Sequence, residues 1–219
     1  MVAVTNADIP PERPVPRLHE PAPHFVARST HGELALTDFR DRWIVLFSHP
    51  ADFTPVCTTE FVTIAQLQDD FEALGVQLIG LSIDSVYAHI AWIRSIEQHF
   101  GVQVRFPVIA DVDMRVSYAY GMLAPNADPY GVRGVFVIDP QGVVQAMLYY
   151  PTDVGRSMPE ILRLVRALQV ARGENVLCPA NWQPGDPVLV SAPMTTDAAA
   201  RPPKGVQTVD WYYATLPHR

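Results

Sequence analysis

The sequence predicts an α/β fold in which helices cover both faces of a mixed central β-sheet. The first observation is an alternation of helix-like and apolar, strand-like runs along the middle of the 219-residue chain. The second is that this region starts as strand, helix, strand, and later contains two apolar runs joined by a tight turn. Parallel strands linked through a helix, followed by an antiparallel hairpin, are typical of a mixed sheet covered by helices.

Each element follows from a local pattern. The predicted strands are apolar runs at residues 43–48, 76–82, 135–138 and 143–150. The predicted helices are longer runs at residues 57–74, 86–100, 113–120 and 158–171. Asp139, Pro140, Gln141 and Gly142 supply the turn between the last two strands. The last helix opens with Ser157 and Glu160 at the spacing of a capping box, and Gly173 follows its end.

A chain of this length fits one large domain with an appendage. Prolines crowd both ends of the chain and exclude long helices there. We therefore predict a proline-rich leader over residues 1–20, one α/β domain over residues 21–172 and a C-terminal arm over residues 173–219. The arm carries Trp182 and the cluster Trp211–Tyr213. Because such rings are costly to leave in water, we expect the arm to pack on a neighbouring surface, that of a second subunit.

The composition excludes several classes of protein. The net charge is −7, from 16 basic and 23 acidic residues, and no basic cluster occurs, which argues against nucleic acid or anionic membranes as partners. No apolar run approaches the ~20 residues that a membrane span needs, and the polar N-terminus lacks a signal-peptide core. Two cysteines do not suggest a secreted disulfide scaffold. We expect a soluble cytoplasmic protein.

The segment at residues 49–60 points to chemistry. It follows the predicted strand at residues 43–48 and places Thr54 as a helix N-cap, Pro55 at the first helical position and Cys57 in the first turn. Free backbone N–H groups and the positive end of the helix dipole favour an anion there. The thiolate is the form of cysteine that attacks, so the sequence predicts a reactive thiol rather than an inert core cysteine.

The run FSHPADFTPVCTTE at residues 47–60 resembles the active-site segment of the peroxiredoxins, thiol peroxidases that reduce hydroperoxides. Further matches occur at residues 80–85, 133–142 and 155–157. The chain looks closest to the long-armed class, which contains the one-cysteine peroxiredoxins and their archaeal thioredoxin-peroxidase-like relatives. This resemblance implies a thioredoxin-like fold, a hydroperoxide substrate, a thiol reductant such as a thioredoxin-like protein, and assembly as a homodimer or a ring of dimers.

The resemblance also implies roles for individual residues. Cys57 is the expected peroxidatic nucleophile, which becomes a sulfenic acid. The Thr54 hydroxyl and the Cys57 N–H are expected to bind the peroxide oxygens, although Thr54 could also act only as a helix cap. Arg133 is expected to stabilise the thiolate and the developing charge. Pro50 is expected to shield the thiolate and shape the pocket.

Three further residues are expected around this centre. Glu60 is predicted to orient Arg133 or Arg156. His49 either packs at the end of the strand or takes part directly. The remaining histidines show no metal-ligand spacing, and neither Cys-x-x-Cys nor His-x-x-x-His occurs. We therefore predict no metal and no cofactor.

Cys178 decides how the catalytic cycle would be completed. Its segment, VLCPANW, resembles the resolving segment of typical two-cysteine peroxiredoxins, and it follows Cys57 by 121 positions (178 − 57). The resemblance implies that Cys178 of one subunit attacks the sulfenic acid of the other, giving a disulfide that a thioredoxin-like donor reduces. The long-armed class usually lacks a cysteine here. A one-cysteine cycle completed by external thiols is therefore the alternative.

Other functions stay open as alternatives. Protein disulfide exchange is disfavoured because Cys-x-x-Cys is absent, and a cysteine hydrolase would need a histidine base that the sequence does not locate. An oligomeric holdase whose thiol senses oxidation is compatible with the resemblance. Some long-armed peroxiredoxins carry a phospholipase activity that depends on a serine before the first core strand. Residues 37–47 read TDFRDRWIVLF, without serine, so we do not expect that activity.

Overall fold

The computed structural model describes residues 15–123, 132–201 and 204–218. Most of the predicted leader, residues 1–14, lies outside this range. The chain divides into two compact units, Met1–Met158 and Pro159–Arg219, and each is described by itself. The domain boundaries proposed from the sequence stay predictions.

The first unit is built on a seven-stranded sheet with the order β2-β1-β5-β4-β3-β6-β7. Its strands are β1 (Val26–Ser29), β2 (Gly32–Ala35), β3 (Trp43–Ser48), β4 (Val76–Ser82), β5 (Val108–Ala110), β6 (Arg133–Ile138) and β7 (Val144–Tyr150). β3, β4 and β5 run parallel, whereas the other pairings are antiparallel, so the sheet is mixed as predicted. β1, β2 and β5 were not predicted because three- or four-residue strands carry little periodicity.

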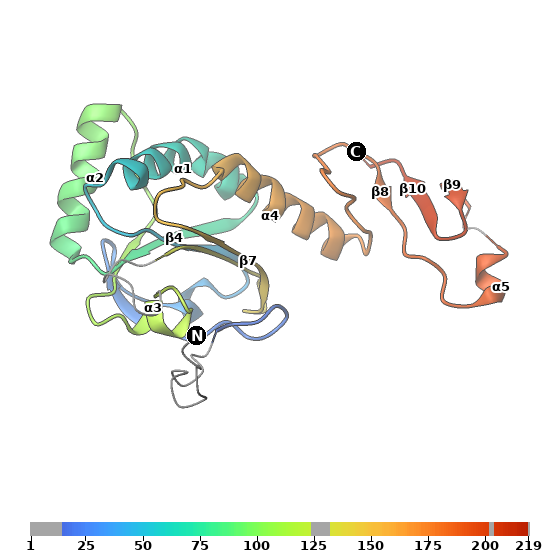
Figure 1. The fold of residues 1–219 in the computed structure, drawn as a ribbon, viewed down its shortest axis with the longest axis horizontal. Coiled ribbons are helices and arrows are strands. Elements are labelled where there is room, and N and C mark those ends of the chain that lie inside the picture. Colours follow the sequence, from blue (N-terminus) through green and yellow to red (C-terminus); the bar gives the residue numbers. More distant parts are fainter. Residues whose placement is uncertain (1–14, 124–131, 202–203, 219) are drawn as a thin grey trace, which may run out of the picture. The chain divides into compact units, whose positions relative to one another are not determined.

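The helices of this unit are α1 (Pro55–Ala73), α2 (Val86–Phe100) and α3 (Arg115–Ala119), with a 3₁₀ turn, η2, at Leu36–Phe39. All three predicted helices are confirmed. α2 is delimited by local signals: the Ser85 side chain accepts a hydrogen bond from the Ala88 N–H, and Gly101 ends the helix with a left-handed φ of 68°. α1 and α2 pack on the sheet opposite α3 (Figure 1).

Alternating side chains of β3 supply both layers of the core. Leu46 faces the α3 side, in a cluster with Val116 and Tyr120. Its neighbour Phe47 faces the other way and packs edge-on against Phe61 of α1. Complete burial of each such side chain contributes roughly 1.5–3 kcal/mol to folding. The contact between Phe47 and Phe61 holds the first turns of α1 against the carboxyl end of β3.

The predicted hairpin between β6 and β7 is confirmed. The Gly142 N–H donates to the Asp139 carbonyl at 2.8 Å, and the Asp139 carboxylate accepts from the N–H groups of Gln141 and Val143. Gly142 has a φ of 78°, a conformation that glycine adopts without strain. This turn sets the register of β6, and thereby the position of its first residue, Arg133.

The second unit contains the predicted last helix, α4 (Met158–Gly173), and a small sheet that was not predicted. The sheet has the order β8-β10-β9, and its elements are β8 (Val188–Leu189), β9 (Gln207–Asp210) and β10 (Tyr213–Leu216), with a short α5 (Thr196–Ala199). Ala167, Val176, Trp182 and Val188 form its buried cluster. Among the described residues, no helix of either unit is long and apolar enough to cross a bilayer.

Candidate active site around Cys57

The loop at residues 50–54 joins β3 to α1 and carries the first predicted site residues. Thr54 occupies the N-cap position with an extended backbone (φ −107°, ψ 148°), and Pro55 is the first helical residue, as predicted. The Thr54 hydroxyl, however, donates to the Ala51 carbonyl at 2.8 Å and caps no helix N–H. Thr54 is therefore the N-cap residue by position, as predicted, but its side chain makes no hydrogen bond to a helix N–H. Its hydroxyl group instead fixes the loop through the Ala51 carbonyl.

Cys57 lies in the first turn of α1 and is completely buried. The Arg133 Nη1 donates to the Cys57 Sγ at 3.3 Å. The Nε and Nη2 atoms of Arg133 donate to the Thr152 carbonyl at 3.1 and 2.6 Å, which fixes the plane of the guanidinium. Pairing of β3 with β6 brings Arg133 to this position from 76 residues away. A fixed cation and free helix N–H groups together favour the thiolate.

Glu60, one turn further along α1, holds two arginines at this centre. Its carboxylate accepts from Arg133 Nη1 at 2.7 Å and from Arg156 Nε and Nη2 at 2.8 and 2.7 Å, as well as from the Arg156 backbone N–H. Burial alone would raise the pKa of Glu60, but Arg156 and Arg133 outweigh it and lower that pKa. One carboxylate faces two guanidinium groups, so the surroundings of the thiol carry net positive charge.

His49 is also buried, at the end of β3. Its Nε2 lies 2.8 Å from the Asp52 Oδ1, and its ring packs against Phe61 and Trp92. Among the described residues, its Nδ1 has no hydrogen-bond partner. Burial lowers the pKa of His49 despite the opposing effect of Asp52, so the ring is neutral at pH 7. This geometry favours the interpretation of His49 as a packed histidine.

Two buried groups of this region were missed from the sequence. Asp52 accepts from His49 and from His89, which belongs to α2. The pKa of Asp52 is lowered, because these hydrogen bonds outweigh the effect of its burial. One signal could have found His89: it shares the spacing of Trp92 and Ile96, which places all three on the buried face of α2.

An open pocket of about 430 Å³ lies over the loop and α1. Pro50, Thr54, Val56, Arg133 and Thr152 contribute to its lining. Three of the predicted site residues therefore face one hollow, and Arg133 links that hollow to the sulfur of Cys57. A small hydroperoxide in this pocket would meet the guanidinium and the first turn of α1 together.

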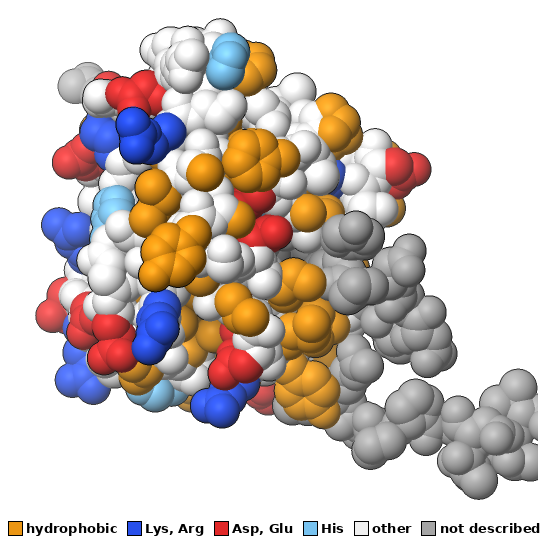
Figure 2. All heavy atoms as spheres, turned by 90° about the vertical axis from the view of Figure 1, so that its left-hand side faces the viewer, with side chains coloured by type: hydrophobic (Ala, Val, Ile, Leu, Met, Phe, Trp, Pro, Cys, Tyr) orange, Lys and Arg blue, Asp and Glu red, His pale blue; other side chains and the backbone are white. Residues whose placement is uncertain are grey.

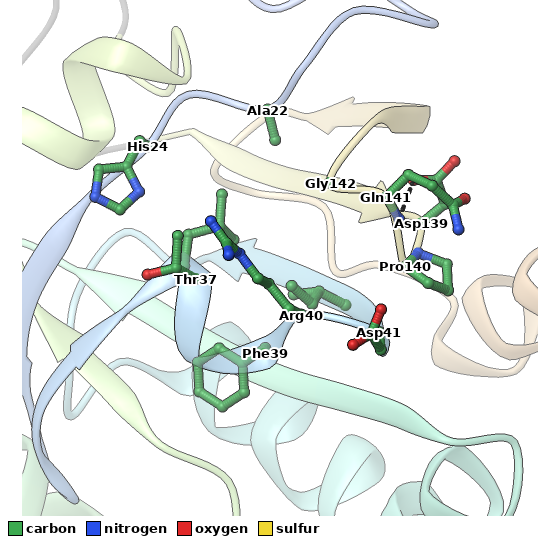
Figure 3. Close-up of a pocket in the computed structure, with 12 residues that line it drawn as sticks. Ala22, His24, Thr37, Phe39, Arg40, Asp41, Asp139, Pro140, Gln141 and Gly142 are labelled. Atoms are coloured by element: carbon green, nitrogen blue, oxygen red, sulfur yellow. Dashed lines mark hydrogen bonds between the residues drawn. The ribbon is translucent and has the colours of Figure 1, made fainter.

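A second pocket of about 400 Å³ lies between η2 and the β6–β7 turn (Figure 3). Thr37, Arg40 and Asp41 line it from η2 and the turn that follows, and Pro140 and Gln141 line it from the β6–β7 turn. Its lining contains neither serine nor cysteine. The pocket therefore offers no nucleophile of the kind that a serine or cysteine lipase requires.

Cys178 belongs to the second unit and has a different environment. It is partly buried, and its Sγ lies 3.4 Å from the Ala167 carbonyl of α4, to which the thiol donates. It packs against the cluster that contains Trp182 and Val176. Burial raises the pKa of Cys178, although Arg163 acts in the opposite direction.

Comparisons with known proteins agree with this geometry. The model of the AhpC/TSA family matches residues 18–147, and that of the C-terminal domain of 1-Cys peroxiredoxin matches residues 167–205. The chain is 48% identical over 193 residues to peroxiredoxin 2 of Thermoplasma acidophilum, covering 87% of this chain and 96% of that protein. It is 47% identical over 211 residues to a peroxiredoxin of Aquifex aeolicus, covering 90% and 95%.

Solved structures extend the similarity to three dimensions. A yeast mitochondrial 1-Cys peroxiredoxin, studied for thiol resolution via glutathione and thioredoxin systems, matches with a TM-score of 0.84 and 38% identity, covering 92% of this chain and 99% of that one. A reduced 2-Cys peroxiredoxin of Plasmodium vivax matches with a TM-score of 0.73 and 32% identity, covering 78% and 92%. These matches confirm the predicted thioredoxin-like fold.

Proposed function

Since the chain belongs to the AhpC/TSA family of peroxiredoxins and is a thiol-dependent peroxidase, we propose that Cys57 is its peroxidatic residue, acting on hydrogen peroxide and organic hydroperoxides. The observation that carries this proposal is the contact of 3.3 Å between Arg133 Nη1 and Cys57 Sγ. A thiolate held against a fixed guanidinium at a helix N-terminus is both stabilised and aimed.

In the reaction, the Cys57 thiolate attacks one peroxide oxygen. An S–O bond forms while the O–O bond breaks, so sulfur is oxidised to the sulfenic acid and the peroxide is reduced to water or an alcohol after one proton is taken up. We assign the binding of the peroxide oxygens to the Thr54 hydroxyl and the Cys57 N–H. Arg133 stabilises the negative charge on the departing oxygen, and Pro50 limits access of solvent to the sulfur.

Rapid mixing of the pre-reduced protein with hydrogen peroxide tests this proposal. We expect one equivalent of peroxide to be consumed at least about 10²-fold faster than by free cysteine. Cys57→Ser is expected to abolish this phase, whereas Cys178→Ser leaves it unchanged. A rate resembling that of free cysteine in the native protein would contradict the assignment.

For the second half of the cycle we propose that Cys178 of a partner subunit resolves the sulfenic acid. Its thiolate would attack the oxidised sulfur of Cys57 and release water, and a thioredoxin-like dithiol in the cytoplasm would reduce the resulting disulfide. The segment around Cys178 supports this cycle. The contact with the Ala167 carbonyl favours the alternative, in which external thiols reduce Cys57, because a thiol that donates to a carbonyl is not poised to attack.

A non-reducing gel after peroxide treatment separates the two cycles. Resolution by Cys178 predicts a dimer band that dithiothreitol removes and that Cys178→Ser lacks. If the band is absent from the native protein, or if Cys178→Ser turns over normally with a thioredoxin system, the one-cysteine cycle is correct.

We further propose that the protein forms a homodimer or a ring of dimers. Large apolar side chains are exposed on the face that contains α2 (Figure 2), and Val26, Tyr87 and Val112 line one hollow of about 550 Å³ there. The arm exposes Trp211 and Tyr212. Sedimentation should therefore give a mass of at least two chains at micromolar concentration. Tyr87→Glu tests the α2 face and Trp211→Glu the arm, and a monomeric native protein would refute both.

A further inference from the structure

Asp52 links the loop of the proposed peroxide site to neighbouring elements of the fold. It lies at the centre of the loop at residues 50–54, and its side chain is almost completely buried. The carboxylate contacts His49 Nε2 and His89 Nδ1, both at 2.8 Å. The Asp52 N–H donates to the Asp84 Oδ2 at 3.0 Å, so the loop is also attached to the end of β4. The position of the loop thus depends on groups outside it.

His89 has an acceptor at each of its ring nitrogens. Its Nδ1 faces the Asp52 Oδ2 at 2.8 Å, and its Nε2 faces the Ile109 carbonyl oxygen of β5 at 3.1 Å. A carboxylate and a backbone carbonyl only accept hydrogen bonds at these distances, so both ring nitrogens must carry a proton for both bonds to form. The ring that makes both contacts is the imidazolium.

The other charged and titratable groups nearby are compatible with this charge. The His49 ring centroid lies 6.0 Å from that of His89, but His49 is neutral and donates through Nε2 alone. Asp84 contacts the Asp52 backbone and carries a second negative charge. The separations of 2.8 Å are those of charge-assisted hydrogen bonds. Two atoms that each bind a tetrahedral zinc ion at about 2.0–2.1 Å lie about 3.3 Å apart. The contacts of 2.8 Å are shorter and therefore fit hydrogen bonds better than metal coordination.

We propose that His89 is a positioning residue, whose buried imidazolium pairs with Asp52 and holds Pro50 and Thr54 in place for peroxide. The proposal rests on the function assigned to Cys57. It adds that peroxide reduction also requires His89, a residue of α2. A second contact from the same helix supports it: Trp92 Nε1 donates to the Thr58 Oγ1 at 3.2 Å, and that hydroxyl donates to the Thr54 carbonyl. α2 therefore holds both the loop and the first turn of α1.

Four variants separate positioning from simple packing. His89→Phe and Asp52→Ala remove the pair and should slow oxidation of Cys57 by about 10- to 100-fold, because small displacements of a reacting site have effects of this size. Asp52→Asn keeps a hydrogen bond to each histidine without the charge, so it should slow oxidation of Cys57 less than Asp52→Ala does. Its amide oxygen can accept from His49, while its NH₂ donates to a neutral His89. His99→Gln, an exposed position on the same helix, is the matched control and should have no effect.

Nitrogen-15 NMR of the histidine side chains gives a readout that packing alone would not change. At pH 7 the native protein should show two protonated nitrogens on the His89 ring, and Asp52→Asn should show one. A neutral His89 in the native protein would overturn the proposal, as would His89→Phe matching His99→Gln in rate. If His89→Phe fails to fold, Asp52→Ala against Asp52→Asn supplies the comparison. Failure of the peroxidase assignment would instead appear as a native protein without Cys57-dependent peroxide reduction.

Discussion

Cys57 and Cys178 show how two thiols of one chain acquire opposite environments. Cys57 is completely buried, yet a guanidinium and the start of α1 face its sulfur. Cys178 is more exposed, yet its thiol donates to a backbone carbonyl and packs on an apolar cluster. Arg163, a cation that acts on the Cys178 thiol, is engaged by Glu160 at 2.6 and 2.7 Å.

In these two thiols, burial and the groups that face the sulfur lead to opposite expectations. If burial decided the matter, Cys57 would be the inert thiol and Cys178 the reactive one. The charges that face each sulfur point the other way, since a fixed cation stabilises a thiolate and an acceptor stabilises a thiol. Variants that alter the groups facing each sulfur should therefore change the difference in reactivity between the two thiols. The largest change is expected for Arg133 and the smallest for Arg163.

Arg133→Gln should remove most of the difference between the two thiols. It deletes the charge at the Cys57 sulfur and the fork that binds the Thr152 carbonyl. Loss of one such electrostatic donor typically costs about 10²–10³ in rate. Stopped-flow peroxide reduction by the pre-reduced variant measures this. The control is Arg115→Gln, an exposed arginine paired with Asp113. A loss below threefold would show that Arg133 is not the group that activates Cys57.

Glu60→Gln should destabilise the protein by about 3–5 kcal/mol at pH 7, because it leaves two buried guanidinium groups without their carboxylate. The pKa of Glu60 is lowered in the folded state, so its contribution is present above the unfolded value of about 4.3 and is lost as the pH falls below it. Urea unfolding should show the same difference between native and variant at pH 7 and pH 5, and a smaller difference at pH 3.5. Glu72→Gln, at an exposed position, should give no such pattern.

In Cys57→Ser protein, Cys178 should react with iodoacetamide more slowly when folded than when unfolded in urea. Burial raises the pKa of this thiol, so less of it is thiolate at pH 8 in the folded protein. When the pKa of a thiol lies well above the pH, each further rise of one unit in that pKa lowers the thiolate fraction about tenfold. The rate profile of the folded protein should therefore lie at higher pH than that of the unfolded chain. Coincident profiles would mean that burial in the folded protein does not control the reactivity of Cys178.

Arg163→Gln should have the smallest effect. Its pair with Glu160 is partly exposed and lies within one turn of α4, where such pairs contribute about 0.3–0.5 kcal/mol. Alkylation of Cys178 should slow by less than about threefold, because burial is the larger influence on the Cys178 pKa and Arg163 is partly exposed and paired with Glu160. A tenfold change would contradict this expectation. It would mean that Arg163 controls the reactivity of Cys178, as Arg133 is expected to control that of Cys57.

The sequence predicted those elements whose signals are local and long. β3, β4, α1 and α2 have clear apolar runs or helix caps, and all four were found. β1, β2 and β5 have too few residues for a period to appear, and the arm sheet of β8, β9 and β10 is built from equally short strands. These strands form because partners already in place satisfy their backbone groups, which is information held elsewhere in the chain.

By itself, the sequence determined that Cys57 lies in the first turn of a helix, because Thr54 and Pro55 favour a helix start through local backbone preferences. The resemblance to peroxiredoxins pointed to Arg133 and Glu60, but only the pairing of β3 with β6 placed the guanidinium at the sulfur. Only packing of α2 set His89 against Asp52, which is 37 residues away in the chain. Backbone preferences act over a few residues, whereas the field at a thiol comes from whichever charges the fold brings to it.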